Sequence, residues 1–160
     1  TIADNVRMGN RDADDKQVAE ALGVAQMADF IAEHEEGLQY MLTPDGTNVS
    51  GGQKQRINIA RTIVKDASVY IFDDSFSALD YRTDAKLRGE LASKLGDTTK
   101  IIVAQRIGTI RHADNIIVLD KGEVVGMGTH EQLLENCAVY KEIALSQLSE
   151  EELKQGGVQQ

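Results

Sequence analysis

The sequence has little of what several classes of protein require. Its 160 residues include one cysteine, Cys137, which excludes an internal disulfide framework and favours a reducing compartment. The longest strand-like apolar runs, at 69–72, 101–104 and 116–119, fall far short of the roughly 20 residues of a membrane-spanning helix. Basic residues are also few: 17 Lys and Arg stand against 26 Asp and Glu. The resulting net charge of −9 argues against nucleic acid as a partner.

What is present is the composition of one globular domain. Hydrophobic residues make up 41% of the chain, too many for a disordered acidic segment, and the length suits a single packed domain. The charge is uneven, because residues 1–40 hold 9 acidic and 3 basic side chains. We interpret this acidic opening as the solvated surface of helices.

The first part of the chain is predicted to be helical. Short helices are expected in residues 1–40, and the Gly, Pro and Asn residues in 33–49 indicate a loop. Ser50 stands three residues before Gln53, the spacing of a capping box, so a helix is predicted to begin there and run to Lys65.

Strands and helices are predicted to alternate after that helix. Residues 69–72 are continuously apolar, which predicts a strand buried on both faces. Asp80 can cap the next helix, a second buried strand is expected at 100–104, and a third at 115–119. This alternation predicts an α/β fold with a mostly parallel sheet flanked by helices.

The first candidate site is the start of the helix at Ser50. Gly51 and Gly52 let the backbone approach a ligand closely, and the exposed N–H groups of a helix start favour an anion such as phosphate. The Ser50 hydroxyl adds a donor. Taken alone, these residues also fit an ordinary capped helix with a flexible entry.

The second candidate site is the end of the strand at 69–72. Asp73 and Asp74 follow it directly, at the edge where open α/β sheets bind their ligands. A carboxylate there can hold Mg²⁺ directly or through water. Taken alone, the pair also fits a polar strand end.

Together these residues closely resemble the ATPase domain of ABC transporters, and the resemblance covers nearly the whole chain in order. Residues 49–56 resemble the signature motif, with Val49 in place of the usual Leu. Residues 69–73 resemble Walker B, 77–80 resemble the D-loop, and 104–106 stand where the family carries its switch histidine. The stretch 114–131 is typical of the exporter branch.

The resemblance implies a partial P-loop NTPase fold with an α-helical signature subdomain. Residues 1–148 would form the later portion of the ATPase domain, followed by a polar tail at 149–160. Within that portion, 1–65 would be the helical subdomain with its signature helix. Residues 66–148 would then hold Walker B, the D-loop, the switch region and the last helices.

The resemblance also assigns ATP and Mg²⁺ as ligands. Asp73 would be the metal ligand and Asp74 and Gln105 the catalytic positions. The nucleotide would be contacted by residues of the signature motif and the D-loop: Ser50, Gly51, Gly52, Gln53, Ser77 and Asp80.

Two departures affect the catalytic positions. The family carries a water-polarising Glu where this chain has Asp74, which is one methylene shorter and draws the carboxylate back by roughly 1.5 Å. The switch histidine is replaced by Gln105, whose amide cannot exchange a proton near neutral pH. Both changes together resemble the degenerate half of a heterodimeric ABC exporter.

An ATP-cradling loop is missing from the sequence. The Gly-x-x-x-x-Gly-Lys-Ser/Thr motif needs a Gly-Lys pair, and the chain has none. The adenine-stacking aromatic and the Q-loop of the family are missing as well. We therefore expect the chain to correspond to the later part of an ATPase domain and to lack an ATP site of its own.

The resemblance implies that the chain works within a larger protein assembly. In the family the signature motif acts in trans on ATP held by a second ATPase half, at the cytoplasmic face of the membrane, beside a transmembrane domain. The chain itself would be soluble. Two alternatives stay open: a non-transport ATPase of the same superfamily, and a non-catalytic fragment that only binds a partner.

Overall fold

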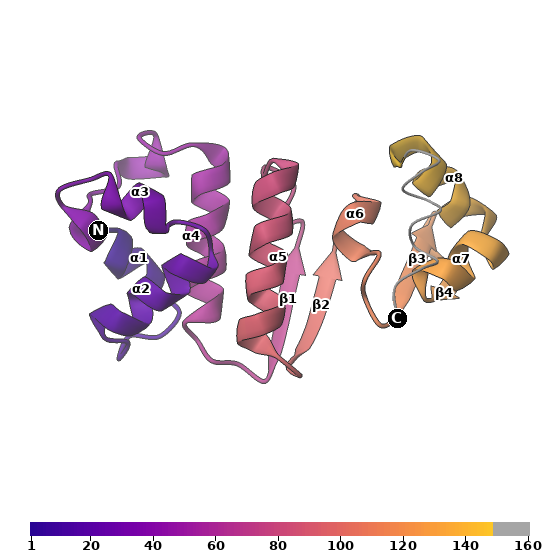
Figure 1. The fold of residues 1–160 in the computed structure, drawn as a ribbon, viewed down its shortest axis with the longest axis horizontal. Helices are drawn as coiled ribbons and strands as arrows, with labels where there is room; N and C mark the ends of the chain where they lie inside the picture. The colour runs from indigo at the N-terminus through magenta and orange to yellow at the C-terminus, as the bar shows by residue number, and fades with distance from the viewer. Residues whose placement is uncertain (149–160) are drawn as a thin grey trace. The chain divides into compact units, whose positions relative to one another are not determined.

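The computed structural model describes residues 1–148, and the tail at 149–160 lies outside the described residues. The chain folds as two compact units, one from Thr1 to Val103 and one that begins at Ala104. The first unit joins a group of helices to a two-stranded sheet, and the second combines a hairpin with short helices (Figure 1).

Helices dominate the first half of the first unit. Thr1, Asp14 and Ser50 each cap a helix through a reciprocal capping box, so the predicted box between Ser50 and Gln53 is confirmed. The loop expected before Ser50 contains two short 3₁₀ turns. The elements of this half are α1 (Ile2–Arg7), α2 (Asp15–Val24), α3 (Ala28–Ala32), η1 (Gly37–Gln39), η2 (Pro44–Gly46) and α4 (Gly51–Ile63).

Helix α4 packs against α1 and α2 and holds the helical half together. Ile57, Ile59 and Ala60 of α4 are buried in the same core as Val6 of α1 and Leu22 of α2. A polar link accompanies this packing, because the Arg61 guanidinium donates to the carbonyl and side-chain oxygens of Asn5, at 2.8 and 3.1 Å. The helix that begins at Ser50 is thereby fixed at its far end.

The sheet of the first unit pairs β1 (Val69–Asp73) with β2 (Thr99–Val103) in parallel, as the alternation predicted. The predicted burial on both faces is wrong for both strands. Tyr70 and Phe72 are buried, but Val69 and Ile71 are 50% and 64% exposed, and alternate residues of β2 are exposed too. The described residues of this unit cover only one face, where α5 (Tyr81–Leu95) contributes Leu87 and Leu91 to the core.

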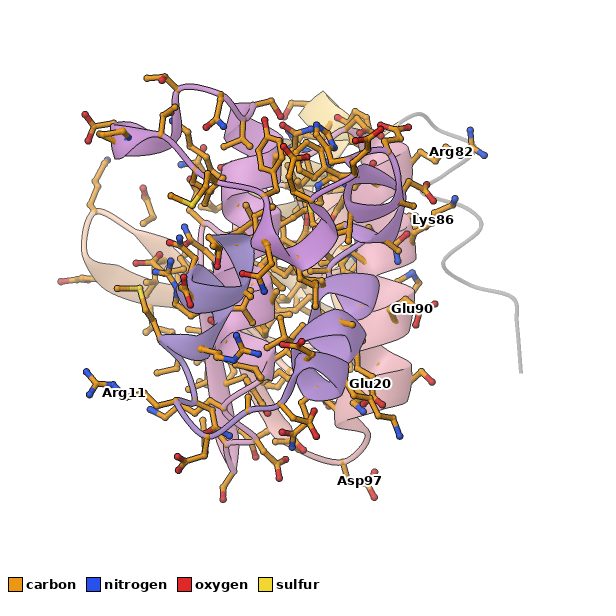
Figure 2. All side chains as sticks on the ribbon, turned by 90° about the vertical axis from the view of Figure 1, so that its left-hand side faces the viewer. Arg11, Glu20, Arg82, Lys86, Glu90 and Asp97 are labelled. Carbon is orange, nitrogen blue, oxygen red and sulfur yellow. The ribbon has the colours of Figure 1, made fainter. Side chains whose placement is uncertain are left out.

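Helix α5 begins at Asp80 as predicted and presents a polar side to solvent. Asp80 accepts the N–H of Thr83 at 2.9 Å, which closes the first turn. Arg82, Lys86 and Glu90, four residues apart, project from one side of the helix (Figure 2). An ion pair at 3.4 Å joins Lys94 to Glu20 of α2.

The second unit is built on an antiparallel hairpin. β3 (Ile116–Asp120) pairs with β4 (Glu123–Gly128), with a bulge between Val118 and Leu119. The strand expected at 115–119 is therefore found, and its partner in the structure is the next strand along the chain. Up to residue 148, the unit also contains the helices α6 (Ile107–Ile110), α7 (His130–Asn136) and α8 (Ala138–Gln147).

A buried polar pair lies between α7 and α8. His130 and Tyr140 are each 2% exposed, and their Nδ1 and Oη atoms share a hydrogen bond of 2.8 Å. Burial lowers the pKa of His130 below its ordinary value near 6.5 and raises the pKa of Tyr140 to about 12. The folded protein therefore holds both groups neutral at pH 7.

The stability of this protein is expected to fall as the pH drops below about 6.5. Below that pH the unfolded chain binds a proton at His130 that the folded chain does not bind until the pH reaches its lowered pKa. The contribution of neutral His130 to the free energy of unfolding is therefore complete above pH 6.5 and is lost as the pH falls toward the lowered pKa. Denaturant unfolding between pH 7.5 and 5 checks this. His130→Gln should show a smaller loss over the same range, and an equal loss in both proteins would contradict the assignment.

Within residues 1–148, no helix combines the length and the apolar character that crossing a bilayer requires.

Candidate functional site

The start of α4 presents backbone N–H groups together with a hydroxyl. The Ser50 Oγ accepts the N–H of Gln53 at 3.2 Å, and the Gln53 Oε1 accepts the N–H of Ser50 at 2.7 Å. Gly51 and Gly52 open the helix, where an N–H has no carbonyl four residues earlier in the helix to bond. Ser50 is exposed and keeps its own hydroxyl proton for donation. This arrangement suits an oxyanion.

The end of β1 presents two exposed carboxylates in different backbone conformations. Asp73 is the last residue of the strand, and its carbonyl accepts the Ser75 hydroxyl at 3.3 Å. Asp74 has a φ of 47°, in the left-handed region, and its N–H donates to the carbonyl of Val103 at 3.0 Å. Asp adopts this conformation more readily than most residues, so the short side chain suits the local backbone.

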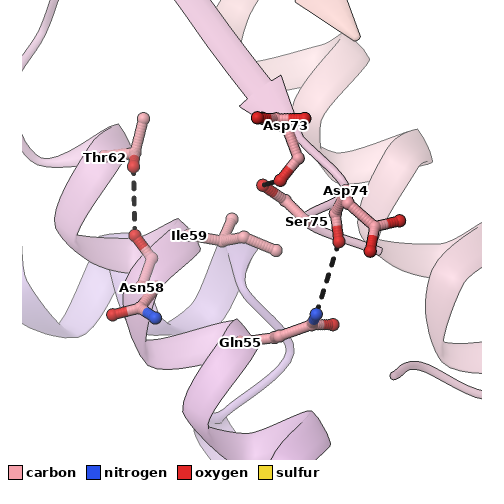
Figure 3. A pocket seen from close by; sticks show the side chains of 7 residues that line it. All are labelled: Gln55, Asn58, Ile59, Thr62, Asp73, Asp74 and Ser75. Atoms are coloured by element: carbon pink, nitrogen blue, oxygen red, sulfur yellow. Dashed lines mark hydrogen bonds between the residues drawn. The ribbon is translucent and has the colours of Figure 1, made fainter. Parts of the chain in front are cut away.

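A hollow of about 170 Å³ separates the end of β1 from α4 (Figure 3). One wall consists of residues spaced three and four apart on α4, and the other of the turn after β1. The lining residues are Gln55, Asn58, Ile59, Thr62, Asp73, Asp74 and Ser75.

The donor set of this hollow fits Mg²⁺ only with help from a further ligand. Carboxylate, hydroxyl and amide oxygens are the ligands that Mg²⁺ prefers, and it is commonly held by one or two carboxylates plus phosphate oxygens. Within residues 1–148, no group of three or more His, Cys, Asp or Glu side chains could hold a metal. Asp73 and Asp74 could therefore supply only some of the ligands of a bound Mg²⁺, and phosphate oxygens would have to supply others.

The structure places most of the sequence-predicted site residues in the first unit. Ser77 lies on the turn after Asp74, and its hydroxyl donates to the Asp74 carbonyl at 3.0 Å. Asp80 caps α5, and the N–H of Thr83 holds the pKa of its carboxyl below the ordinary value. Gln105 belongs to the second unit, where it is exposed and its carbonyl accepts the Gln147 side chain at 2.9 Å.

Sequence reasoning placed Gln55 within the signature motif but gave it no role of its own, whereas the structure shows its side chain bonded to the turn after β1. Its side chain reaches Asp74, Ser77 and Ala78. The available signal was helical spacing, since Gln55, Asn58 and Thr62 form a polar stripe on an otherwise amphipathic helix. Such a stripe indicates a polar neighbour but does not say which one.

Comparisons with known proteins agree on one family. The family model described as ABC transporter matches residues 1–77. An uncharacterized ABC transporter ATP-binding protein of Mycobacterium tuberculosis (strain ATCC 25618 / H37Rv) is 45% identical over 150 residues, which is 92% of this chain and 25% of that protein. This chain belongs to the ABC transporter ATP-binding family.

Two further proteins similar to this chain are a flippase and an exporter. An ATP-dependent lipid A-core flippase of Xanthomonas euvesicatoria pv. vesicatoria (strain 85-10) is 40% identical over 144 residues, covering 89% of the chain and 24% of the flippase. The solved structure of a bacterial Atm1-family ABC exporter with ATP bound matches with a TM-score of 0.89 and 37% identity, over 94% of the chain and 26% of that exporter.

These matches support the partial ABC ATPase fold that the sequence predicted. This chain spans about a quarter of the length of the relatives that it matches. Its fold corresponds to part of an exporter's ATP-binding domain, with helices around a small parallel sheet.

Proposed function

We propose that this chain is part of the ATP-hydrolysing machinery of an ABC exporter, working at the cytoplasmic face of the membrane beside a transmembrane domain. The observation that carries the proposal is the capped start of α4, where Ser50 and the glycines present a hydroxyl and backbone N–H groups to an anion. The similarity to a lipid A-core flippase and to an Atm1-family exporter supports transport as the coupled process.

The signature residues act in trans in this proposal. Ser50, Gly51, Gly52 and Gln53 close on the phosphates of ATP that a second ATPase half holds in its own phosphate loop. The capped start of α4 supports this role, because its hydroxyl and backbone N–H groups are exposed to an incoming phosphate. In this proposal the second half holds the competent site, because the departures at Asp74 and Gln105 fall on this chain.

The site at the end of β1 is the slow one in this proposal. Asp73 would ligate Mg²⁺, which neutralises phosphate charge when it is bound. The Asp74 carboxylate stops roughly 1.5 Å short of the reach of a Glu, and a displacement of about 1 Å can lower a rate on the order of a hundredfold. Gln105, at the position of the family's switch histidine, carries an amide that can donate a hydrogen bond but cannot exchange a proton near neutral pH. The D-loop residues Ser77 and Asp80 would lie at the interface with the partner half.

Residues 1–160 alone are expected to bind Mg-ATP weakly or not at all, because the strongest phosphate contacts come from a loop that the sequence lacks. Isothermal titration of Mg-ATP into the chain, into a second ATPase half and into their mixture tests the proposal. Binding should appear with the second half and tighten in the mixture. Micromolar affinity for the chain alone, or no tightening in the mixture, would rule the arrangement out.

A further inference from the structure

The side chain of Gln55 is bonded at three points to the segment 74–78. Its Nε2 donates to the Ser77 hydroxyl at 3.2 Å and to the Asp74 carbonyl at 3.4 Å. Its Oε1 accepts the N–H of Ala78 at 3.0 Å. A primary amide offers donors and an acceptor in one plane, so a single side chain can hold both ends of a turn.

A second contact joins the same two elements independently of Gln55. A Cβ on Gly52 would lie 3.1 Å from the carbonyl oxygen of Ala78 and 3.6 Å from Cδ2 of Leu79. The first turn of α4 therefore lies directly against the segment 74–78, and the glycine permits that approach.

The segment that Gln55 holds begins in a sparsely populated conformation. Asp74 has a φ of 47°, and such a residue keeps its conformation only when surrounding contacts fix it. Its N–H donates to the carbonyl of Val103, and its carbonyl accepts the Ser77 hydroxyl. The same carbonyl also accepts the Gln55 amide (Figure 3). Loss of Gln55 would remove the bonds that come from α4.

We propose that Gln55 is a positioning residue that locks the segment 74–78 to the first turn of α4. We call these three hydrogen bonds from Gln55 the clamp. Because Ser50–Gln53 lie at the start of the same helix as Gln55, the clamp fixes the position of the signature loop relative to the turn that carries Asp74. A change in one is then passed to the other through a helix turn and three hydrogen bonds. This inference rests on the proposed function, in which both segments contact nucleotide.

The test uses the assembled exporter with Gln55→Met, which keeps the length of the side chain and removes its hydrogen bonds. Amide hydrogen exchange at Ala78 should rise about fivefold, the effect of losing one hydrogen bond. The kcat for ATP should fall about tenfold because the signature loop is less firmly placed. KM should stay within about twofold because binding contacts are kept.

Two variants make the result specific. Gln55→Glu keeps an acceptor for the N–H of Ala78 and loses the donor, so it should restore Ala78 protection and part of kcat. Gln39→Met makes the same chemical change at an exposed glutamine of η1 and should alter neither quantity.

The hydrogen-exchange and turnover results together test three claims: that the clamp exists, that it positions residues for catalysis, and that the assembly hydrolyses ATP. Unchanged exchange at Ala78 in Gln55→Met would overturn the clamp, whatever happens to turnover. Faster exchange with an unchanged kcat would show that the clamp exists and positions nothing for catalysis, which also overturns the proposal. An unmodified assembly that exchanges slowly at Ala78 but hydrolyses no ATP would instead refute the proposed function.

Discussion

Replacing Ser50 by Arg is expected to nearly abolish ATP turnover by the assembled exporter. The Arg side chain would fill the space in front of the N–H groups of Gly51 and Gly52, where the partner's nucleotide is proposed to bind. It would also remove the hydroxyl, and loss of a single aligned donor can lower a rate by roughly a hundredfold or more. Steady-state ATPase activity of the purified assembly measures the effect.

Two further variants separate this effect from loss of structure. Thr129→Arg removes the corresponding capping box of α7, so it should lower the free energy of unfolding by a similar amount, about 1 kcal/mol. It should leave ATP turnover nearly unchanged. Asp74→Asn should also change turnover little, because that site is proposed to be slow already. Asn suits the left-handed conformation of residue 74 as well as Asp does, so only the charge is removed.

The assignment of this chain as the degenerate half depends on that contrast. If Asp74→Asn abolished turnover while Ser50→Arg left it intact, the competent site would lie on this chain and the assignment would be wrong.

Replacing Gly9 by Ala is expected to destabilise the protein severely. A Cβ at Gly9 would lie 1.9 Å from the carbonyl oxygen of Arg61 and 3.1 Å from Cγ1 of Val64, so α1 and α4 would have to separate. The obstructing atom belongs to the backbone of a packed helix and cannot swing aside. Overpacking typically costs about 1–3 kcal/mol, and this case should reach the upper end.

The matched control is Gly23→Ala, in the last turn of α2. A Cβ there meets nothing within 4 Å, so Ala should stabilise by about 0.5–1 kcal/mol through its higher helix propensity. Denaturant unfolding of both variants checks the pair, and a Gly9→Ala protein as stable as the original would contradict the close approach of the two helices. The site at the start of α4 depends on that approach, since Arg61 anchors the far end of the helix.

The local sequence was sufficient to predict which helix or strand each candidate site residue of the first unit begins or ends. Helix caps and continuous apolar runs act over a few residues, so Ser50 and Asp80 were identifiable as helix starts, and β1 and β2 were placed within one residue. The same residues carried the resemblance to the ABC family, which the comparisons confirm.

Tertiary structure decided which of these residues act on one another. The bonds from Gln55 to the segment 74–78 join residues 19 to 23 positions apart, and no local pattern encodes such a pairing. The left-handed backbone of Asp74 depends on Val103 of the neighbouring strand. Burial was misjudged for the same reason: an apolar run shows that a strand can be covered on both faces, but only the packed elements determine whether each face is covered.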